Sequence, residues 1–391
     1  MTLMTAFVES CVQTAAGSAV AAQRRARGKP QARKLLKLLA DRKHILVTTH
    51  QHPDPDALGS SFALAHLLKA RLKDARVTFS VKGSIPGGIN EAFLRYTNLN
   101  LTPWSDEALK DFDAIVMLDV QPMFAYSPLP AGLMPTAVID HHRARGRKPQ
   151  CPFCDIRADV GATSSIVFSY FMELEVPISP DLGATLLYAI ETDLAGAAGT
   201  PTELDNIALS SLTLIADTHK LYQMRYVDLP QSYYAAYYAG LHSAIYYDSA
   251  MIAHIDTIDS LEKPAVIADF LLRFEKVQWS LVSAINGNKM ILSLRSSDHN
   301  RSAGDVMRKL VRGIGEGGGH RAKAGGYVAL ENGSLAEIER HRTTLRRRLL
   351  RTLAIQMSRG QKLVPRAELE NEVKTTAKAR RSAKEAAKIN S

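Results

Sequence analysis

Short apolar runs alternate with helix-like segments along the first half of the chain, and this order limits the possible folds more than any other feature. A β-branched run at 45–49 is followed by apolar residues spaced like one face of a helix, at positions 58, 62, 65, 68 and 72. Further strands are predicted at 76–81, 114–118 and 137–139, and helices at 161–172, 181–190 and 203–221. The alternation predicts an α/β domain with a doubly wound, mostly parallel sheet.

The second half of the chain has a different order of predicted strands and helices. It predicts strands at 251–255, 277–284, 290–295 and 326–330, with helices at about 264–274 and 304–311. Leucines at 345, 349, 350 and 353 stand among arginines at near-helical spacing, which predicts a C-terminal helix docked on this part. We therefore expect a second, smaller α/β domain, joined to the first by a tyrosine-rich segment at 218–250.

The basic charge of the chain is confined to its two ends. The net charge of +10 divides into +7 for residues 1–43, −8 for 44–339 and +11 for 340–391. The Ala/Lys/Arg-rich end from 375 has almost no large apolar residues, so it is expected to be a solvated tail. Two interpretations of this tail stay open, a solubilising terminus and an arm that contacts RNA.

No apolar run approaches the roughly 18 residues that a membrane-spanning helix needs. Glu9 interrupts the mildly apolar start, and a basic cluster follows it, which is the reverse of a secretory signal. We therefore expect a cytoplasmic protein without a membrane partner. Three cysteines cannot form a disulfide framework, which agrees with a reducing compartment, and Cys151 and Cys154 are interpreted as incidental thiols rather than a zinc or redox pair.

Acidic residues and histidines follow the predicted strands of the first half. They are His50, Asp54, Asp56, Asp119, Asp140, His141 and His142, and Asp193 at the end of an apolar helix. Since the carboxyl ends of strands in a doubly wound sheet meet at one edge, these side chains are expected to converge. Helix caps and surface turns are the alternative interpretation, but they do not explain the order of the residues.

Several carboxylates in one cleft repel one another and are costly to desolvate unless cations lie between them. Oxygen-rich sites with one or two imidazoles suit Mn²⁺ or a similar ion. Two metal ions about 3.5–4 Å apart are the usual apparatus for hydrolysing phosphate esters. The pattern therefore predicts a site for two divalent cations.

The order of these residues resembles the motifs of the DHH phosphoesterase family. His50 to Ser60 reads H-x-x-P-D-x-D-x-x-G-S, and a lone Asp, an Asp-His-His and a fourth Asp follow. The run from Gly317 to His320 is similar to the GGGH signature of the associated DHHA1 domain. This resemblance implies five segments: a basic N-terminal extension at 1–43, a DHH catalytic domain at 44–217, a linker at 218–250, a DHHA1 substrate-binding domain at 251–355 and a basic C-terminal tail at 356–391.

The resemblance also implies a role for each residue. One Mn²⁺ would be bound by His50, Asp54 and Asp119, and a second by Asp56, Asp119, His141 and Asp193. Asp140 would orient its histidine neighbours, and His142 would face the scissile phosphate. The substrate phosphate would be held by Gly318, Gly319 and His320, with Arg295 as a further contact. The active site would then lie in a cleft between the domains, and Mg²⁺ or Co²⁺ are possible substitutes for Mn²⁺.

Two stretches depart from the family pattern. The run 143–148, Arg-Ala-Arg-Gly-Arg-Lys, stands where an Asn is usual, and Leu194 begins an apolar run where Thr-Gly is usual. The extra arginines favour a more anionic substrate, or one with a terminal phosphate.

The implied function is a Mn²⁺-dependent phosphoesterase in which hydroxide, activated by two metal ions, attacks phosphorus. Its expected substrates are short oligonucleotides (nanoRNA), with 3′-phosphoadenosine 5′-phosphate (pAp) as a further candidate. An alternative is a phosphodiesterase for linear or cyclic dinucleotide messengers. An alternative from another class is an inactive nucleic-acid-binding or regulatory protein, and a homodimer is left open.

Overall fold

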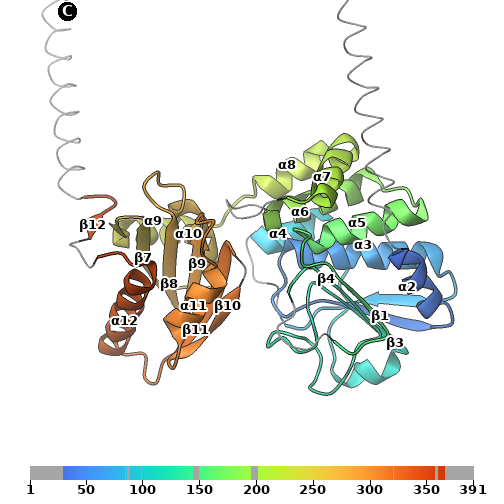
Figure 1. Ribbon diagram of the computed structural model, residues 1–391, viewed down its shortest axis with the longest axis horizontal. Helices are drawn as coiled ribbons and strands as arrows, with labels where there is room; N and C mark the ends of the chain where they lie inside the picture. Colours follow the sequence, from blue (N-terminus) through green and yellow to red (C-terminus); the bar gives the residue numbers. More distant parts are fainter. Residues whose placement is uncertain are drawn as a thin grey trace, which may run out of the picture. The chain divides into compact units, whose positions relative to one another are not determined.

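A computed structural model describes residues 30–83, 85, 89–97, 99–143, 149–194, 201–319, 321–356 and 360–365. Contacts divide the chain into two units, with the boundary between Asp228 and Leu229. Each unit has its own sheet (Figure 1). Within the described residues, no helix combines the length and the apolar character needed to cross a membrane. Most of the basic extension at 1–43 and of the tail at 356–391 lies outside the described residues.

Unit 1 contains a five-stranded sheet in which every neighbouring pair is parallel. The strand order is β2-β1-β3-β4-β5. The strands are β1 (His44–Thr48), β2 (Arg76–Phe79), β3 (Ala114–Leu118), β4 (Ala137–Asp140) and β5 (Phe153–Ile156). The predicted parallel α/β sheet is thus confirmed, and β1 and β3 flank the point where the strand order reverses, which is where such sheets bind ligands.

The helices of unit 1 are α2 (Gln31–Leu39), α3 (Pro55–Arg71), α4 (Ile89–Thr97), α5 (Thr163–Leu174), α6 (Pro180–Leu194), α7 (Glu203–Ile215) and α8 (Thr218–Arg225), with a short 3-10 helix η1 (Glu107–Asp111). The single helix predicted at 203–221 is wrong, because two helices occupy this stretch. Asp217 separates them, since its side chain accepts hydrogen bonds from the backbone N–H groups of His219 and Lys220 and caps α8.

Alternate residues of the strands enter different cores. Ile45 and Val47 of β1 pack into the large core formed with α2, α3, α5 and α6, whereas Leu46 faces the opposite side. On that opposite side the apolar cluster includes Leu109 of η1 and half-buried Trp104 and is covered by loops. The two-residue period of a strand therefore builds both cores from one sheet.

Helices α3 and α6 approach each other closely in unit 1 because of small residues. A Cβ atom placed on Gly59 would lie 2.8 Å from the Cβ of Ala189, which is too close for any side chain at position 59. Asp56 lies three residues before Gly59, and Asp193 lies four residues after Ala189. The contact between the two helices therefore sets how near these carboxylates can come.

Unit 2 is built on a seven-stranded mixed sheet of order β10-β11-β9-β8-β7-β6-β12, in which only β7 and β8 pair in parallel among the described strands. The strands are β6 (Ile245–Tyr247), β7 (Ala250–Thr257), β8 (Trp279–Asn286), β9 (Lys289–Ser296), β10 (Gly315–Gly319), β11 (Lys323–Ala329) and β12 (Gln361–Lys362). The helices are α9 (Gln231–Ser243), α10 (Lys263–Leu271), α11 (Ala303–Val311) and α12 (Leu335–Leu353).

The leucines at 345, 349, 350 and 353 are buried on α12 against the sheet of unit 2, which confirms the predicted docked helix. The segment 218–250, predicted as a linker, holds α8, α9 and β6, and α8 belongs to unit 1. Residues 31–39 of the predicted basic extension form α2, whose Ala32, Leu35 and Leu39 are buried in the core of unit 1.

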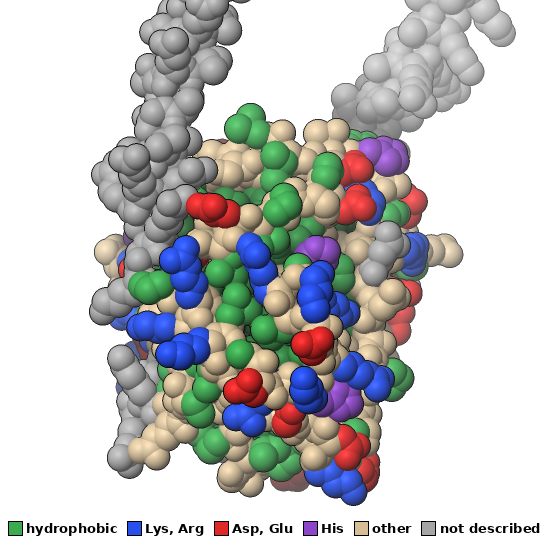
Figure 2. Space-filling view, turned by 90° about the vertical axis from the view of Figure 1, so that its right-hand side faces the viewer, with side chains coloured by type: hydrophobic (Ala, Val, Ile, Leu, Met, Phe, Trp, Pro, Cys, Tyr) green, Lys and Arg blue, Asp and Glu red, His purple; other side chains and the backbone are tan. Residues whose placement is uncertain are grey.

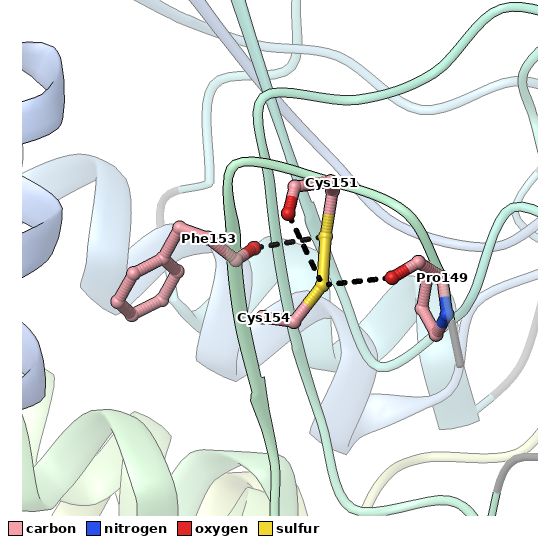
Figure 3. Close-up of a disulfide and its surroundings, with 4 residues drawn as sticks. All are labelled: Pro149, Cys151, Phe153 and Cys154. Atoms are coloured by element: carbon pink, nitrogen blue, oxygen red, sulfur yellow. Dashed lines mark hydrogen bonds between the residues drawn. A yellow bond between two sulfur atoms is a disulfide. The ribbon is translucent and has the colours of Figure 1, made fainter.

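Cys151 and Cys154 form a disulfide at the start of β5 (Figure 3). Their interpretation as incidental thiols is therefore wrong. Residues 149–153 turn back before β5, and the turn brings the two Cα atoms to 6.3 Å, within the range that a disulfide spans. Because stable disulfides are rare in reducing compartments, cysteine usage no longer supports a cytoplasmic location, which stays a prediction.

The face drawn in Figure 2 shows Lys and Arg side chains interspersed with acidic and apolar ones. The acidic balance of residues 44–339 is therefore not displayed as a continuous acidic surface on this face. Part of that negative charge is instead buried in unit 1, where Asp56, Asp119 and Asp140 are at most 2% exposed.

Candidate metal centre

The donor residues predicted from the motifs lie at the carboxyl ends of the strands of unit 1 and at two helix ends. Asp54 caps α3 by accepting a hydrogen bond from Ala57 N, and Asp56 lies in the first turn of that helix. Asp193 lies in the last turn of α6. The others, His50, Asp119, His141 and His142, follow β1, β3 and β4 directly. Local structure thus presents every predicted donor at one edge of the sheet.

The structure brings these side chains together in three overlapping groups. The groups are His50, Asp54 and Asp119; Asp56, His141 and Asp193; and Asp119, His141 and His142. Within each group the ligand atoms lie within 4.8 Å of one another. Asp119 belongs to two groups, and its φ of 58° holds it in a left-handed conformation that is unusual for a residue other than glycine. Their roles as ligands remain a prediction that this geometry supports.

Backbone carbonyls orient two of the imidazoles. His50 Nδ1 lies 2.8 Å from the carbonyl of Gln51, and His141 Nδ1 lies 3.3 Å from the carbonyl of Val160. Because a carbonyl only accepts, Nδ1 carries the proton in both rings, and Nε2 remains as the ligand atom. His141 Nε2 lies 3.4 Å from an oxygen of Asp119 and from one of Asp193, and His50 Nε2 lies 3.7 Å from Asp119.

The charges of the site shift the pKa values of its histidines upward. Burial alone lowers the pKa of His50, but its hydrogen bond to Asp119 and the charges of Asp54 and Asp119 outweigh burial and raise it to about 9. Burial likewise lowers the pKa of His141, and the charges of Asp193, Asp119 and further carboxylates raise it to about 10. The carboxylates therefore attract positive charge strongly, as a metal site requires.

The Asp56 carboxylate is fully buried, and burial, followed by the charges of Asp119 and Asp193, raises its pKa well above the usual range. The first turn of α5 binds this carboxylate, because Thr163 N and Ser164 N donate to its two oxygens at 2.7 and 2.9 Å. These backbone N–H groups have no partner within their own helix. A carboxylate held in this way, beside further carboxylates and imidazoles, fits a divalent cation.

Asp140 orients the ring of His142 through a hydrogen bond. Asp140 Oδ1 lies 2.7 Å from His142 Nδ1, and Asp140 Oδ2 accepts a 2.7 Å hydrogen bond from Gln121 Nε2. Burial acts to raise the pKa of Asp140, but the charge and hydrogen bond of His142 lower it, so Asp140 stays ionised. Burial lowers the pKa of His142, but the charges of Asp119 and Asp140 and the hydrogen bond to Asp140 raise it above its usual value.

Sequence reasoning missed the residues that orient the ligands. Thr163 Oγ1 donates to Asp119 Oδ1 at 2.7 Å, and Thr163 N binds Asp56, so one residue supports two predicted ligands. Gln121 was missed as well. The only signal was the hydroxyl-rich start of the predicted helix at 161–172, and nothing local shows that it meets Asp56, 107 residues earlier in the chain.

The predicted substrate-binding residues lie in unit 2. Gly318 and Gly319 belong to β10, where they pair with Gly325 and Ala324 of β11. Arg295 lies on β9, and its Nε donates to Asp269 at 2.8 Å, so a phosphate would share this arginine with a carboxylate. His320, residues 144–148 of the arginine-rich run and residues 195–198 after Leu194 lie outside the described residues. The predicted cleft between the domains stays a prediction, because the two units are described separately.

Residues 44–190 match the DHH family, N-terminal domain. The chain is 27% identical over 306 residues to an uncharacterized protein of Methanocaldococcus jannaschii, which covers 78% of this chain and 62% of that protein. It is 29% identical over 174 residues to a probable manganese-dependent inorganic pyrophosphatase of Enterococcus faecalis, covering 44% of this chain and 56% of that protein. The chain thus spans about three fifths of the length of these relatives.

Among solved structures, an exopolyphosphatase-related protein from Bacteroides fragilis superposes with a TM-score of 0.64. The match covers 83% of this chain and 98% of that chain at 19% sequence identity, so it supports the fold. A parallel five-stranded sheet with Asp and His donors at its carboxyl edge, together with the match over residues 44–190, defines the class of the first unit. Unit 1 therefore contains a DHH-family N-terminal domain, at residues 44–190.

Proposed function

We propose that this protein is a metal-dependent phosphoester hydrolase. The observation that carries the proposal is the overlap of the donor groups, because Asp119 belongs to the groups that contain His50 and His141, and one of its oxygens lies near each of these histidines. A carboxylate placed between two sets of donors suits a pair of divalent ions. The probable manganese-dependent pyrophosphatase of Enterococcus faecalis supports Mn²⁺ as the ion.

When bound, two such ions would polarise the phosphoryl group and lower the pKa of a water molecule at the site. The protein residues supply orientation and charge around them. Asp140 fixes the ring of His142 through Nδ1, which leaves Nε2 as the nitrogen that we assign to the phosphate. The charges of Asp119 and Asp140 raise the pKa of His142, which favours the protonated ring that a hydrogen bond to an anionic phosphate oxygen needs.

Within this proposal the substrates are short oligonucleotides and pAp, as the motifs imply. The phosphate contacts come from Arg295, Gly318, Gly319 and His320. Linear or cyclic dinucleotides are the alternative substrates. Inorganic pyrophosphate is a second candidate, because a relative named a probable manganese-dependent inorganic pyrophosphatase aligns with 44% of the chain. A cytoplasmic location and RNA contact through the basic tail also remain parts of the proposal.

The test is hydrolysis of a panel by the purified full chain. The panel contains di- to pentanucleotides, pAp, cyclic dinucleotides and pyrophosphate, each with Mn²⁺ or with a chelator. Removal of an outer partner of a metal ligand costs up to about 100-fold in activity. We expect Asp119→Asn, which changes a predicted ligand itself, to lower the rate of hydrolysis by more than this. Asp217→Asn, which alters the N-terminal cap of α8, is the control and should keep full activity. Hydrolysis of no panel member with Mn²⁺ would contradict the proposal.

A further inference from the structure

A row of aromatic rings runs beside the predicted metal ligands of unit 1. The ring of Tyr126 meets that of His50 with centroids 5.7 Å apart and nearly perpendicular planes. The ring of Phe124 lies 5.4 Å from that of Tyr126 and 6.0 Å from that of His142. We call Phe124 and Tyr126 the aromatic edge. It connects a histidine of one donor group to a histidine of another.

The loop that carries the aromatic edge is held in place by hydrogen bonds. Gln51 N donates to the carbonyl of Tyr126 at 3.0 Å, and Gln51 Nε2 donates to the carbonyl of Ser127 at 3.1 Å. Within the loop, Phe124 N donates to the carbonyl of Gln121, and Ser127 N donates to that of Phe124. The loop is therefore tied to the segment that follows β1, next to His50, and its rings are positioned before any substrate binds.

The two rings differ in burial. Phe124 is half-buried and packs on the apolar cluster beneath the sheet, which includes Met117 and Val120. Tyr126 is 42% exposed, and its neighbour Met123 is 46% exposed. The exposed part of the Tyr126 ring does not contribute to packing of the core. It lies beside the buried carboxylates and offers a surface on which a planar group of a ligand can pack.

We propose that the aromatic edge binds the nucleobase of the substrate next to the predicted metal centre, and so selects phosphoesters that carry a base. This inference rests on the proposed phosphoester hydrolase function. Stacking of a base on an aromatic side chain tolerates any base, because every base has a π face. A substrate without a ring, such as pyrophosphate, gains nothing from Tyr126, so the aromatic edge favours nucleotides over inorganic phosphates.

The experiment compares two probes on the Mn²⁺-loaded full chain, adenosine 5′-monophosphate and ribose 5-phosphate, which carry a base and a hydroxyl group, respectively, at C1 of the same ribose phosphate. Dissociation constants measured by titration calorimetry give a preference ratio for the base. We expect the wild type to prefer the nucleotide and Tyr126→Ala to lower this ratio about 10-fold, within the range found when a stacking aromatic residue is removed. Tyr126→Phe keeps the ring and should keep the ratio.

Two further variants separate stacking from damage to the fold. Tyr126→Leu keeps apolar volume without a ring and should behave like Tyr126→Ala, and Tyr222→Ala, which changes an exposed tyrosine on α8, should keep the wild-type ratio. A wild type without preference for the nucleotide, or a Tyr126→Ala ratio equal to that of the wild type, would overturn the inference. Failure of the hydrolase proposal shows separately, as absence of hydrolysis of every panel substrate.

Discussion

The Thr163→Val substitution removes one hydroxyl group, nearly keeps the side-chain volume, and isolates one hydrogen bond of the site. Thr163 Oγ1 donates to Asp119 Oδ1 at 2.7 Å. Thr163 is 0% exposed and Asp119 is 2% exposed, so bulk water cannot replace the lost donor. Hydrogen bonds to charged groups contribute about 1.5–3 kcal/mol. Loss of a partner that orients a metal ligand costs about 10–100-fold in metal affinity, which is the same range of free energy.

We therefore expect the Mn²⁺ affinity of Thr163→Val to fall about 10–100-fold. The assay is titration calorimetry with Mn²⁺ on chelator-treated protein, with thermal unfolding to establish that the variant folds. Thr163→Ser keeps a hydroxyl group and should recover most of the affinity. Thr213→Val is a matched control on α7, because its hydroxyl donates only to the exposed turn at Leu209 O, and it should bind Mn²⁺ like the wild type.

Two results would refute this reasoning. One is a Thr163→Val variant that unfolds cooperatively and binds Mn²⁺ as tightly as the wild type. The other is a Thr163→Ser variant as weak as Thr163→Val, which would show that the hydroxyl group is not what matters. In either case Asp119 would be held by its other neighbours, or would not bind the metal.

Three further outcomes are expected. In metal-free protein, the raised pKa values of His50 (about 9) and His141 (about 10) stabilise the fold fully below about pH 6.5, and this stabilisation is lost as the pH rises through 9 to 10. Calorimetry should therefore show Tm falling as the pH rises to 10, and a rising Tm would contradict this expectation. Mn²⁺ at about 100 times its Kd should stabilise the protein by about 2.7 kcal/mol, and an unchanged Tm would argue against binding to the folded state. Thiol titration of denatured protein should find two additional thiols per chain after reduction, from Cys151 and Cys154; no difference would exclude the disulfide.

The parallel sheet could be predicted because β1, β3 and β4 are apolar runs, and a strand buried on both faces reads as such a run. The convergence of the predicted donor residues could be anticipated because each follows a strand or lies at a helix end, positions that the topology gathers at one edge. The strand β5 could not be predicted in this way. Exposed Cys154 and buried Asp155 interrupt its apolar character, and it is a strand because it pairs with β4.

The supporting residues of the site depend on contacts between distant parts of the chain. Asp56 receives its hydrogen bonds from Thr163 and Ser164, and Asp140 receives one from Gln121. Neither hydrophobic periodicity nor turn-forming residues in the sequence predict such contacts between distant residues. The disulfide between Cys151 and Cys154 was missed for a similar reason, because two cysteines three positions apart are consistent with free thiols, a metal site or a disulfide until the turn between them is known.

The close packing of α3 and α6 at Gly59 and Ala189 determines a distance within the site. It sets the helix spacing near the Asp56 and Asp193 carboxylates, which are predicted to bind one metal ion, so residues that do not touch that ion would help to decide which ion fits. A larger side chain at position 59 would push the helices apart and admit a wider cation before it removed any ligand. Substitutions at this contact between the helices would then alter the choice of ion without changing a predicted ligand.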